Sequence, residues 1–173
     1  MSYISAINTL VNPTFIYKGK TLLGEEECGN IEIKGKHVIL QTDHMDFREK
    51  VLKTIFQKGP ATSICDYVII SEEVVLICEL KSKNTTSKSV QQKNTARLIK
   101  YLLSMLKAHD KIITPLPEIK YACFSNKTRP GQQQSKPNNS KIIKSGTLEC
   151  DGTRHSSYQL SGNATYLLMQ FVT

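Results

Sequence analysis

The sequence contains no apolar run long enough to cross a membrane and no recognisable secretion signal. None of its 173 residues belongs to an apolar stretch near the roughly 18–20 residues that a spanning helix needs. The N-terminal segment MSYISAINTLVNP has no basic region followed by an apolar stretch. We therefore expect no membrane partner.

Paired cysteines and familiar cofactor motifs are also missing. The five cysteines stand at positions 28, 65, 78, 123 and 150 without a CxxC pair, which indicates neither a zinc ribbon nor a disulfide framework. The four histidines lack metal-ligand spacing, and there is no glycine-rich phosphate loop or GxSxG motif. Reduced thiols in the cytoplasm are the expected state.

The composition is that of an ordinary globular protein. Hydrophobic residues make up 39% of the chain and charged residues 22%, which argues against wholesale disorder. The length fits one domain over residues 1–173, with a core at about 45–125. Residues 126–141 hold no apolar side chain and predict a long polar loop.

Charge is unevenly placed along the chain. Residues 1–80 hold 8 Lys and Arg against 11 Asp and Glu, a net charge of −3, whereas residues 81–173 hold 15 against 4, a net charge of +11. A basic half beside an acidic half favours a polyanionic partner, most simply nucleic acid. The alternative is a basic protein that binds nothing in particular.

Hydrophobic periodicity predicts both strands and helices. The first 45 residues look β-rich. The end of the chain holds two short strand candidates, at 142–143 and 147–150, and an apolar segment at 164–172 whose pattern selects neither helix nor strand. In the helix at 90–109, we expect Leu98, Tyr101, Leu102 and Met105 to face the core. The remaining expected elements are strands at 15–17, 31–34, 37–41 and 118–124 and a helix at 43–57.

The runs ICDYVII and VVLICELK, within residues 64–81, predict a β-hairpin. They are separated by Ser-Glu-Glu, and both alternating faces are mostly apolar, so these strands should be central and covered on both sides. The chain as a whole is expected to be an α/β protein with a central mixed sheet flanked by helices.

The hairpin carries the sharpest functional signal. If its turn consists of Glu72 and Glu73, Asp66 stands directly across from Glu79, and Lys81 lies on the same face. Two adjacent carboxylates repel, so a cation between them is expected, and hard oxygen ligands suit Mg²⁺ or Mn²⁺. A metal there would activate water, and Lys81 would orient that water or offset phosphate charge. The alternatives are a chance pattern or a structural ion pair.

These residues resemble the PD-(D/E)XK phosphodiesterase superfamily, which has the restriction-endonuclease-like fold. Asp66 matches the first acid, Glu79 the second and Lys81 the motif lysine, with the helix at 90–109 and the strand at 118–124 in the family's order. The resemblance covers about residues 45–125 and implies Mg²⁺-dependent cleavage of DNA or, less often, RNA. Extra N-terminal strands would precede this core.

The resemblance also implies accessory residues. The family's helix often presents a glutamine, and Gln91 is favoured over Gln92 because it projects about 20° from Leu98, on the expected core side. A glutamine hydrogen-bonded near the helix start is the alternative. Glu49 is the candidate for a third metal ligand, with residues 25–27 as rivals; a solvated surface charge is the alternative for each.

Seven basic residues and no acid fall between positions 81 and 107. They predict a surface that follows nucleic-acid phosphates, although a solvated helix face would give the same pattern. The polar loop would either order on nucleic acid or be a passive insertion. The candidate contacts are Lys83, Lys88, Lys93, Arg97, Lys127 and Arg129.

Together these features predict a metal-dependent nuclease acting on DNA, as an endonuclease rather than an exonuclease. By analogy with the family, we expect it to act in a prokaryotic defence or repair system, as a homodimer or in a larger complex. The alternatives are a catalytically inactive nucleic-acid-binding or interaction subunit and an RNA-cleaving effector.

Overall fold

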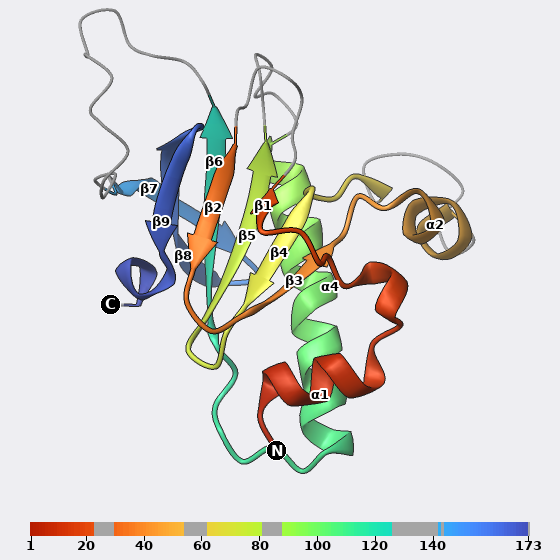
Figure 1. Ribbon diagram of the computed structural model, residues 1–173. Helices are drawn as coiled ribbons and strands as arrows, with labels where there is room; N and C mark the ends of the chain where they lie inside the picture. The colour runs from red at the N-terminus through yellow and green to blue at the C-terminus, as the bar shows by residue number, and fades with distance from the viewer. Residues whose placement is uncertain (23–29, 54–61, 81–87, 126–141, 143, 173) are drawn as a thin grey trace, which may run out of the picture.

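A six-stranded mixed sheet forms the centre of the computed structural model, which describes residues 1–22, 30–53, 62–80, 88–125, 142 and 144–172 (Figure 1). In spatial order the strands are β3 (Val38–Gln41), β4 (Tyr67–Ile70), β5 (Val74–Leu80), β6 (Glu118–Ser125), β8 (Thr153–Ser161) and β7 (Lys144–Cys150). Strands β3, β4 and β5 form an antiparallel meander, β5, β6 and β8 run parallel to one another, and β7 is antiparallel to β8.

Two further layers cover the faces of this sheet. One face packs on helices α1 (Tyr3–Leu10) and α4 (Lys88–His109), and the other on a small sheet of β1 (Thr21–Leu22), β2 (Ile31–Lys34) and β9 (Ala164–Leu167) (Figure 1). Both β4 and β5 are buried along their whole length. The prediction of central strands in a mixed α/β sheet is therefore confirmed.

The hairpin has the turn that the sequence predicts. The Ser71 N–H donates to the Val74 carbonyl at 2.9 Å, which leaves Glu72 and Glu73 as the two turn residues. Tyr67 pairs with Cys78 and Ile70 with Val75. The strand predicted at 37–41 is β3, which pairs with β4. In the sequence it precedes the helical segment that begins at Met45 rather than following it.

The predicted helix at 43–57 begins as α2 (Met45–Phe47) and continues as a π-helical turn, η3 (Arg48–Leu52). The later part of that prediction lies outside the described residues. The prediction of a helix at 90–109 and of a strand at 118–124 is confirmed by α4 and β6. Among the described residues, no helix is long and apolar enough to cross a membrane.

The prediction of a β-rich N-terminal segment is wrong in two places. Residues 3–10 form α1, whose start is capped by the Ser2 hydroxyl. The strand expected at 15–17 is instead the end of a 3₁₀ turn, η1 (Pro13–Phe15), followed by an isolated bridge from Ile16 to Leu40.

The predicted core face of α4 is also wrong. Tyr101 and Met105 are 66% and 54% exposed, and Leu98 and Leu102 are half-buried. The helix has two neighbouring apolar stripes, and the one that meets the sheet includes small and polar residues. The buried set is Gln92, Thr95, Ala96, Ile99, Leu103 and Leu106.

The C-terminal part completes the sheet with a tight hairpin between β7 and β8. Asp151 and Gly152 both have positive φ, at 51° and 77°, as an Asp-Gly turn joining two twisted strands requires. The apolar segment at 164–172, for which the sequence pattern selected no secondary structure, consists of β9 and a 3₁₀ turn, η5 (Leu168–Phe171). Strand β7 spans the candidate at 147–150.

Candidate active site

The pairing of β4 with β5 places Asp66 beside Glu79. Tyr67 faces Cys78 in the ladder, which is the register that the sequence predicts, and Asp66 and Glu79 are the next residues outward from that pair. The Leu80 N–H donates to Asp66 Oδ2 at 2.6 Å. This bond fixes the Asp66 carboxylate at the end of the hairpin.

Glu79 is completely buried. Its side chain is 0% exposed and lies on the same face of β5 as Val75 and Ile77, which pack toward α1 and α4. Burial of a carboxylate is costly unless other groups stabilise its charge. A buried acid beside a second acid is therefore a feature that packing alone does not favour.

The thiol of Cys65 lies within electrostatic reach of both carboxylates. Burial is the largest cause that raises the pKa of Cys65, and the negative charges of Glu79 and Asp66 raise it further. The Cys65 N–H donates to the Thr95 hydroxyl of α4 at 2.8 Å. Cys65 thus connects the acidic end of the hairpin to helix α4.

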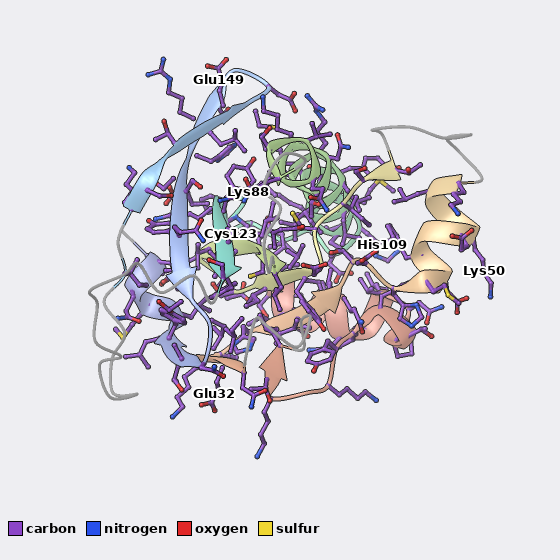
Figure 2. The ribbon with its side chains drawn as sticks, turned by 90° about the horizontal axis from the view of Figure 1, so that it is seen from above. Glu32, Lys50, Lys88, His109, Cys123 and Glu149 are labelled. Carbon is purple, nitrogen blue, oxygen red and sulfur yellow. The ribbon has the colours of Figure 1, made fainter. Side chains whose placement is uncertain are left out.

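On the other side of Glu79, the parallel strands bring further polar groups to the same end of the sheet. Glu79 is in register with Cys123 on β6, and Cys123 with Gln159 on β8. Lys88, from the first turn of α4, donates from Nζ to Gln159 Oε1 at 3.2 Å. Burial raises the pKa of Cys123, an effect that the nearby Lys88 ammonium opposes (Figure 2).

The two glutamines of α4 have different surroundings. Gln91 is half-buried and donates from Nε2 to the Ile64 carbonyl at 3.3 Å, so it touches the segment that leads into Asp66. Gln92 is 2% exposed and is part of the helix face that meets the sheet. The projection that favoured Gln91 relied on the wrong core face, but the structure still brings Gln91 near the first acid.

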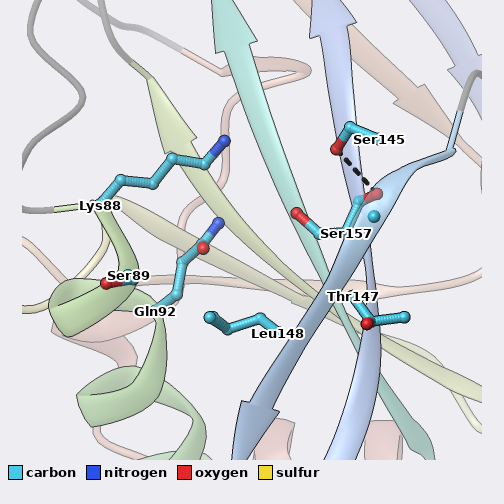
Figure 3. Close-up of a pocket in the computed structure, with 8 residues that line it drawn as sticks. Lys88, Ser89, Gln92, Ser145, Thr147, Leu148 and Ser157 are labelled. Atoms are coloured by element: carbon cyan, nitrogen blue, oxygen red, sulfur yellow. Dashed lines mark hydrogen bonds between the residues drawn. The ribbon is translucent and has the colours of Figure 1, made fainter.

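Between α4 and the β7–β8 hairpin lies an open pocket of about 250 Å³ (Figure 3). Its lining includes Gln92, Leu148 and Ser157, and the sequence pattern of the β7–β8 hairpin predicted no functional role for it. In the sequence, the repeated serine and threonine residues of β7 and β8 were the available signal for this pocket, but no motif spacing links them to α4. The full described lining is Lys88, Ser89, Gln92, Ser145, Gly146, Thr147, Leu148 and Ser157.

The structure does not bring Glu49 to the carboxylate pair. Glu49 lies on η3, where its half-exposed side chain forms an ion pair with Lys53. Within the described parts of the chain, no three His, Cys, Asp or Glu side chains gather as metal ligands. The rival acids at 25–27 lie outside the described residues.

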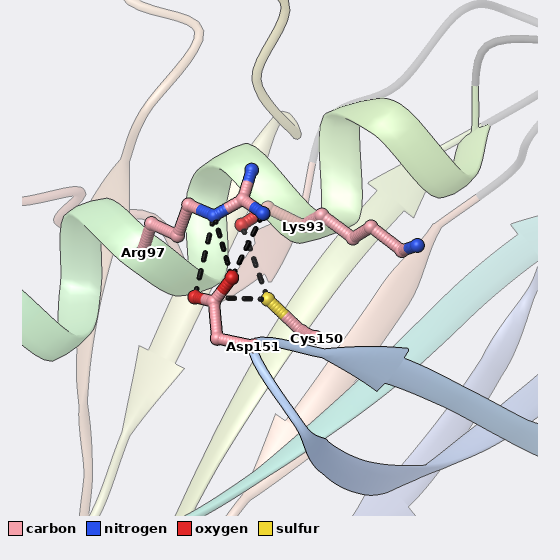
Figure 4. Close-up of polar contacts among 4 residues, drawn as sticks. All are labelled: Lys93, Arg97, Cys150 and Asp151. Carbon is pink, nitrogen blue, oxygen red and sulfur yellow. Dashed lines mark hydrogen bonds and ion pairs between the residues drawn. The ribbon is translucent and has the colours of Figure 1, made fainter.

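The predicted nucleic-acid contacts are only partly described. Arg97 is an exposed residue held by Asp151 in an ion pair of 2.8 Å, beside the contact from Cys150 Sγ to the Lys93 carbonyl (Figure 4). Lys93 is half-buried on the same helix. The remaining predicted cations, including the motif lysine, lie outside the described residues: Lys81, Lys83, Lys127 and Arg129.

Comparisons of the chain with protein-family models, with curated proteins and with solved structures found no match.

Proposed function

We propose that the protein is a metal-dependent nuclease that hydrolyses phosphodiester bonds in DNA, as an endonuclease. The observation that supports this most is that Asp66 and Glu79 stand one position beyond the Tyr67–Cys78 pair of the hairpin, at the point where β5 ends and before α4 begins. A buried acid close to a second, half-buried acid is typical of sites that work on charged substrates. The predicted defence or repair role remains part of this proposal.

The donor set fits Mg²⁺ or Mn²⁺ in kind. Asp66 and Glu79 offer hard carboxylate oxygens, and Mg²⁺ is commonly held by one or two carboxylates while it keeps several waters. When bound, the metal would supply a Lewis acid to the phosphodiester. The two acids need no third protein ligand for such a site.

The protein's own groups would position the reactants. The Leu80 N–H holds one oxygen of Asp66 and so fixes the direction of the other. Lys81 follows Glu79 by two positions, and its ammonium would hold the attacking water or neutralise phosphate charge. Gln91, in contact with the Ile64 carbonyl, would position one of these groups.

A non-catalytic nucleic-acid-binding subunit is the second candidate. The full burial of Glu79 favours it, because a metal must reach that carboxylate from solvent. For either candidate we place the protein in the cytoplasm, where the buried free thiols of Cys65, Cys78, Cys123 and Cys150 would stay reduced.

Cleavage of plasmid DNA, single-stranded DNA and RNA with Mg²⁺, Mn²⁺ or EDTA tests the proposal. We expect metal-dependent cleavage of DNA that falls at least about a hundredfold in Glu79→Gln. Glu73→Gln, which neutralises an exposed acid in the turn of the same hairpin, is the matched control and should cleave normally. Thermal melting shows whether each variant is folded.

Two results would overturn the nuclease. The first is a folded Glu79→Gln protein that cleaves as well as the wild type. The second is a wild-type protein that binds DNA but cleaves nothing with either metal, which would support the binding subunit.

A further inference from the structure

The pocket between α4 and the β7–β8 hairpin is distinct from the carboxylate pair. It opens beside the first turn of α4, and its far wall is formed by strand residues that do not belong to the Asp66–Glu79 hairpin (Figure 3). Figure 3 shows the Lys88 and Gln92 side chains reaching from the helix toward β7 and β8. The pocket therefore has a wall of its own and side chains directed into it.

The lining of the pocket suits an anion. The eight described lining residues include one cation, Lys88, and no carboxylate. Figure 3 shows the Ser157 hydroxyl directed toward Lys88 and Gln92, which adds a neutral donor. Phosphate oxygens accept hydrogen bonds from groups of this kind.

Gln92 is the observation that points to a ligand. The side chain is 2% exposed, and its Nε2 has no hydrogen-bond partner among the described residues. A buried amide without a partner costs free energy that a Leu or Met would not cost. A bound acceptor that approaches this amide would remove that cost.

The N-terminus of α4 also favours an anion in this pocket. α4 is 22 residues long, and its first turn contains no acidic residue. The N-terminus of a helix carries partial positive charge, which favours an anion near the first turn. Lys88 adds a full positive charge at the same place.

We propose that this pocket binds a phosphate group of a nucleic-acid strand, held by the Lys88 ammonium and the Gln92 amide. This subsite rests on the proposed function in taking nucleic acid as the ligand, but it does not depend on cleavage. It would give the strand a fixed point at the same end of the sheet as the carboxylate pair.

Fluorescence anisotropy of a labelled DNA duplex in EDTA tests the subsite. We expect Lys88→Ala to weaken binding about tenfold and to make the salt dependence shallower by about one contact. Lys107→Ala removes the same charge from the last turn of α4 and is the matched control, which should change affinity much less.

Gln92→Met is the second variant, because it keeps the size of the side chain and removes the buried amide. We expect it to weaken DNA binding severalfold while its melting temperature stays the same or rises. Equal binding by Gln92→Met and wild type, or equal losses in Lys88→Ala and Lys107→Ala, would overturn the subsite.

These outcomes separate the subsite from the nuclease. If the binding losses occur as expected but no metal supports cleavage, only the nuclease is wrong. If Glu79→Gln abolishes cleavage while Gln92→Met binds DNA like the wild type, only the subsite is wrong.

Discussion

His155 shows how burial alone changes the chemistry of one side chain. It is 6% exposed on β8, and its ring meets the ring of Tyr121 edge-on at 5.7 Å between centroids. Burial is the largest cause that lowers the pKa of His155, and the positive charge of Lys100 lowers it further. The native protein therefore holds this histidine in its neutral form.

The stability of the protein should fall as the pH drops below about 6.5, the ordinary pKa of histidine. Because the pKa of His155 is lowered in the folded protein, the unfolded chain takes up a proton first as the pH falls. The contribution of the neutral His155 to stability is therefore complete only above the ordinary pKa of histidine. Urea unfolding at several pH values should show a smaller loss in His155→Leu. His109→Gln, at a largely exposed site, should lose as much as the wild type.

If His155→Leu loses stability on acidification as steeply as the wild type does, another group is responsible. Carboxylates contribute their own pH dependence at lower pH, so the comparison belongs between about pH 7.5 and 5.5. The difference between the two histidine variants isolates the buried residue.

At the scale of elements, a single carboxylate joins the hairpin to the N-terminal helix. Glu72 accepts hydrogen bonds from the Tyr3 N–H at 3.1 Å and from the Ile4 N–H at 3.0 Å. Both donors belong to the first turn of α1, where N–H groups lack partners within the helix. The turn between the two site strands thus caps a helix that lies far from it in sequence.

Replacing Glu72 by Gln should lower the free energy of unfolding by about 1–2 kcal/mol, because a charged cap is lost from the helix start. Urea denaturation measures the change. Glu73→Gln alters the neighbouring, exposed turn residue and should stay within about 0.5 kcal/mol of the wild type. Similar values for the two variants would show that the cap contributes nothing.

This contact explains why α1 could not be predicted. The segment YISAINTL contains β-branched residues and is short, so it is a weak helix by itself. Its stability comes from packing against α4 and from Glu72, about 70 positions away in sequence. The hairpin register was predictable, because strand alternation and a two-residue turn are local properties.

The glutamine pair shows the same limit for the candidate site. Sequence periodicity predicted one core face on α4, but its residues Tyr101 and Met105 are exposed and the helix meets the sheet through a neighbouring face. The sheet accepts Thr95 because its hydroxyl donates to the Gln91 carbonyl and accepts from the Cys65 N–H. Such tertiary hydrogen bonds leave no trace in hydropathy, so the helix face that holds Thr95 and Gln92 was not recognised as the buried one.

At the scale of the whole molecule, the candidate groups gather where the topology allows a site. Strands β5, β6 and β8 run parallel, and α4 begins beyond the end of β5 (Figure 1). Ligands of open α/β sheets bind beyond the carboxyl ends of such strands. This end of the sheet holds Glu79, Gln159 and Lys88. It therefore brings a residue of the acidic first half of the chain close to residues of the basic second half.

Direct titration of Mn²⁺, with free metal followed by electron paramagnetic resonance, tests the proposed metal site without DNA. We expect the wild-type protein to bind Mn²⁺ and folded Glu79→Gln to bind it at least about tenfold more weakly, while Glu73→Gln binds like the wild type. Equal Mn²⁺ binding by wild type and Glu79→Gln would contradict the assignment of Asp66 and Glu79 as a metal site.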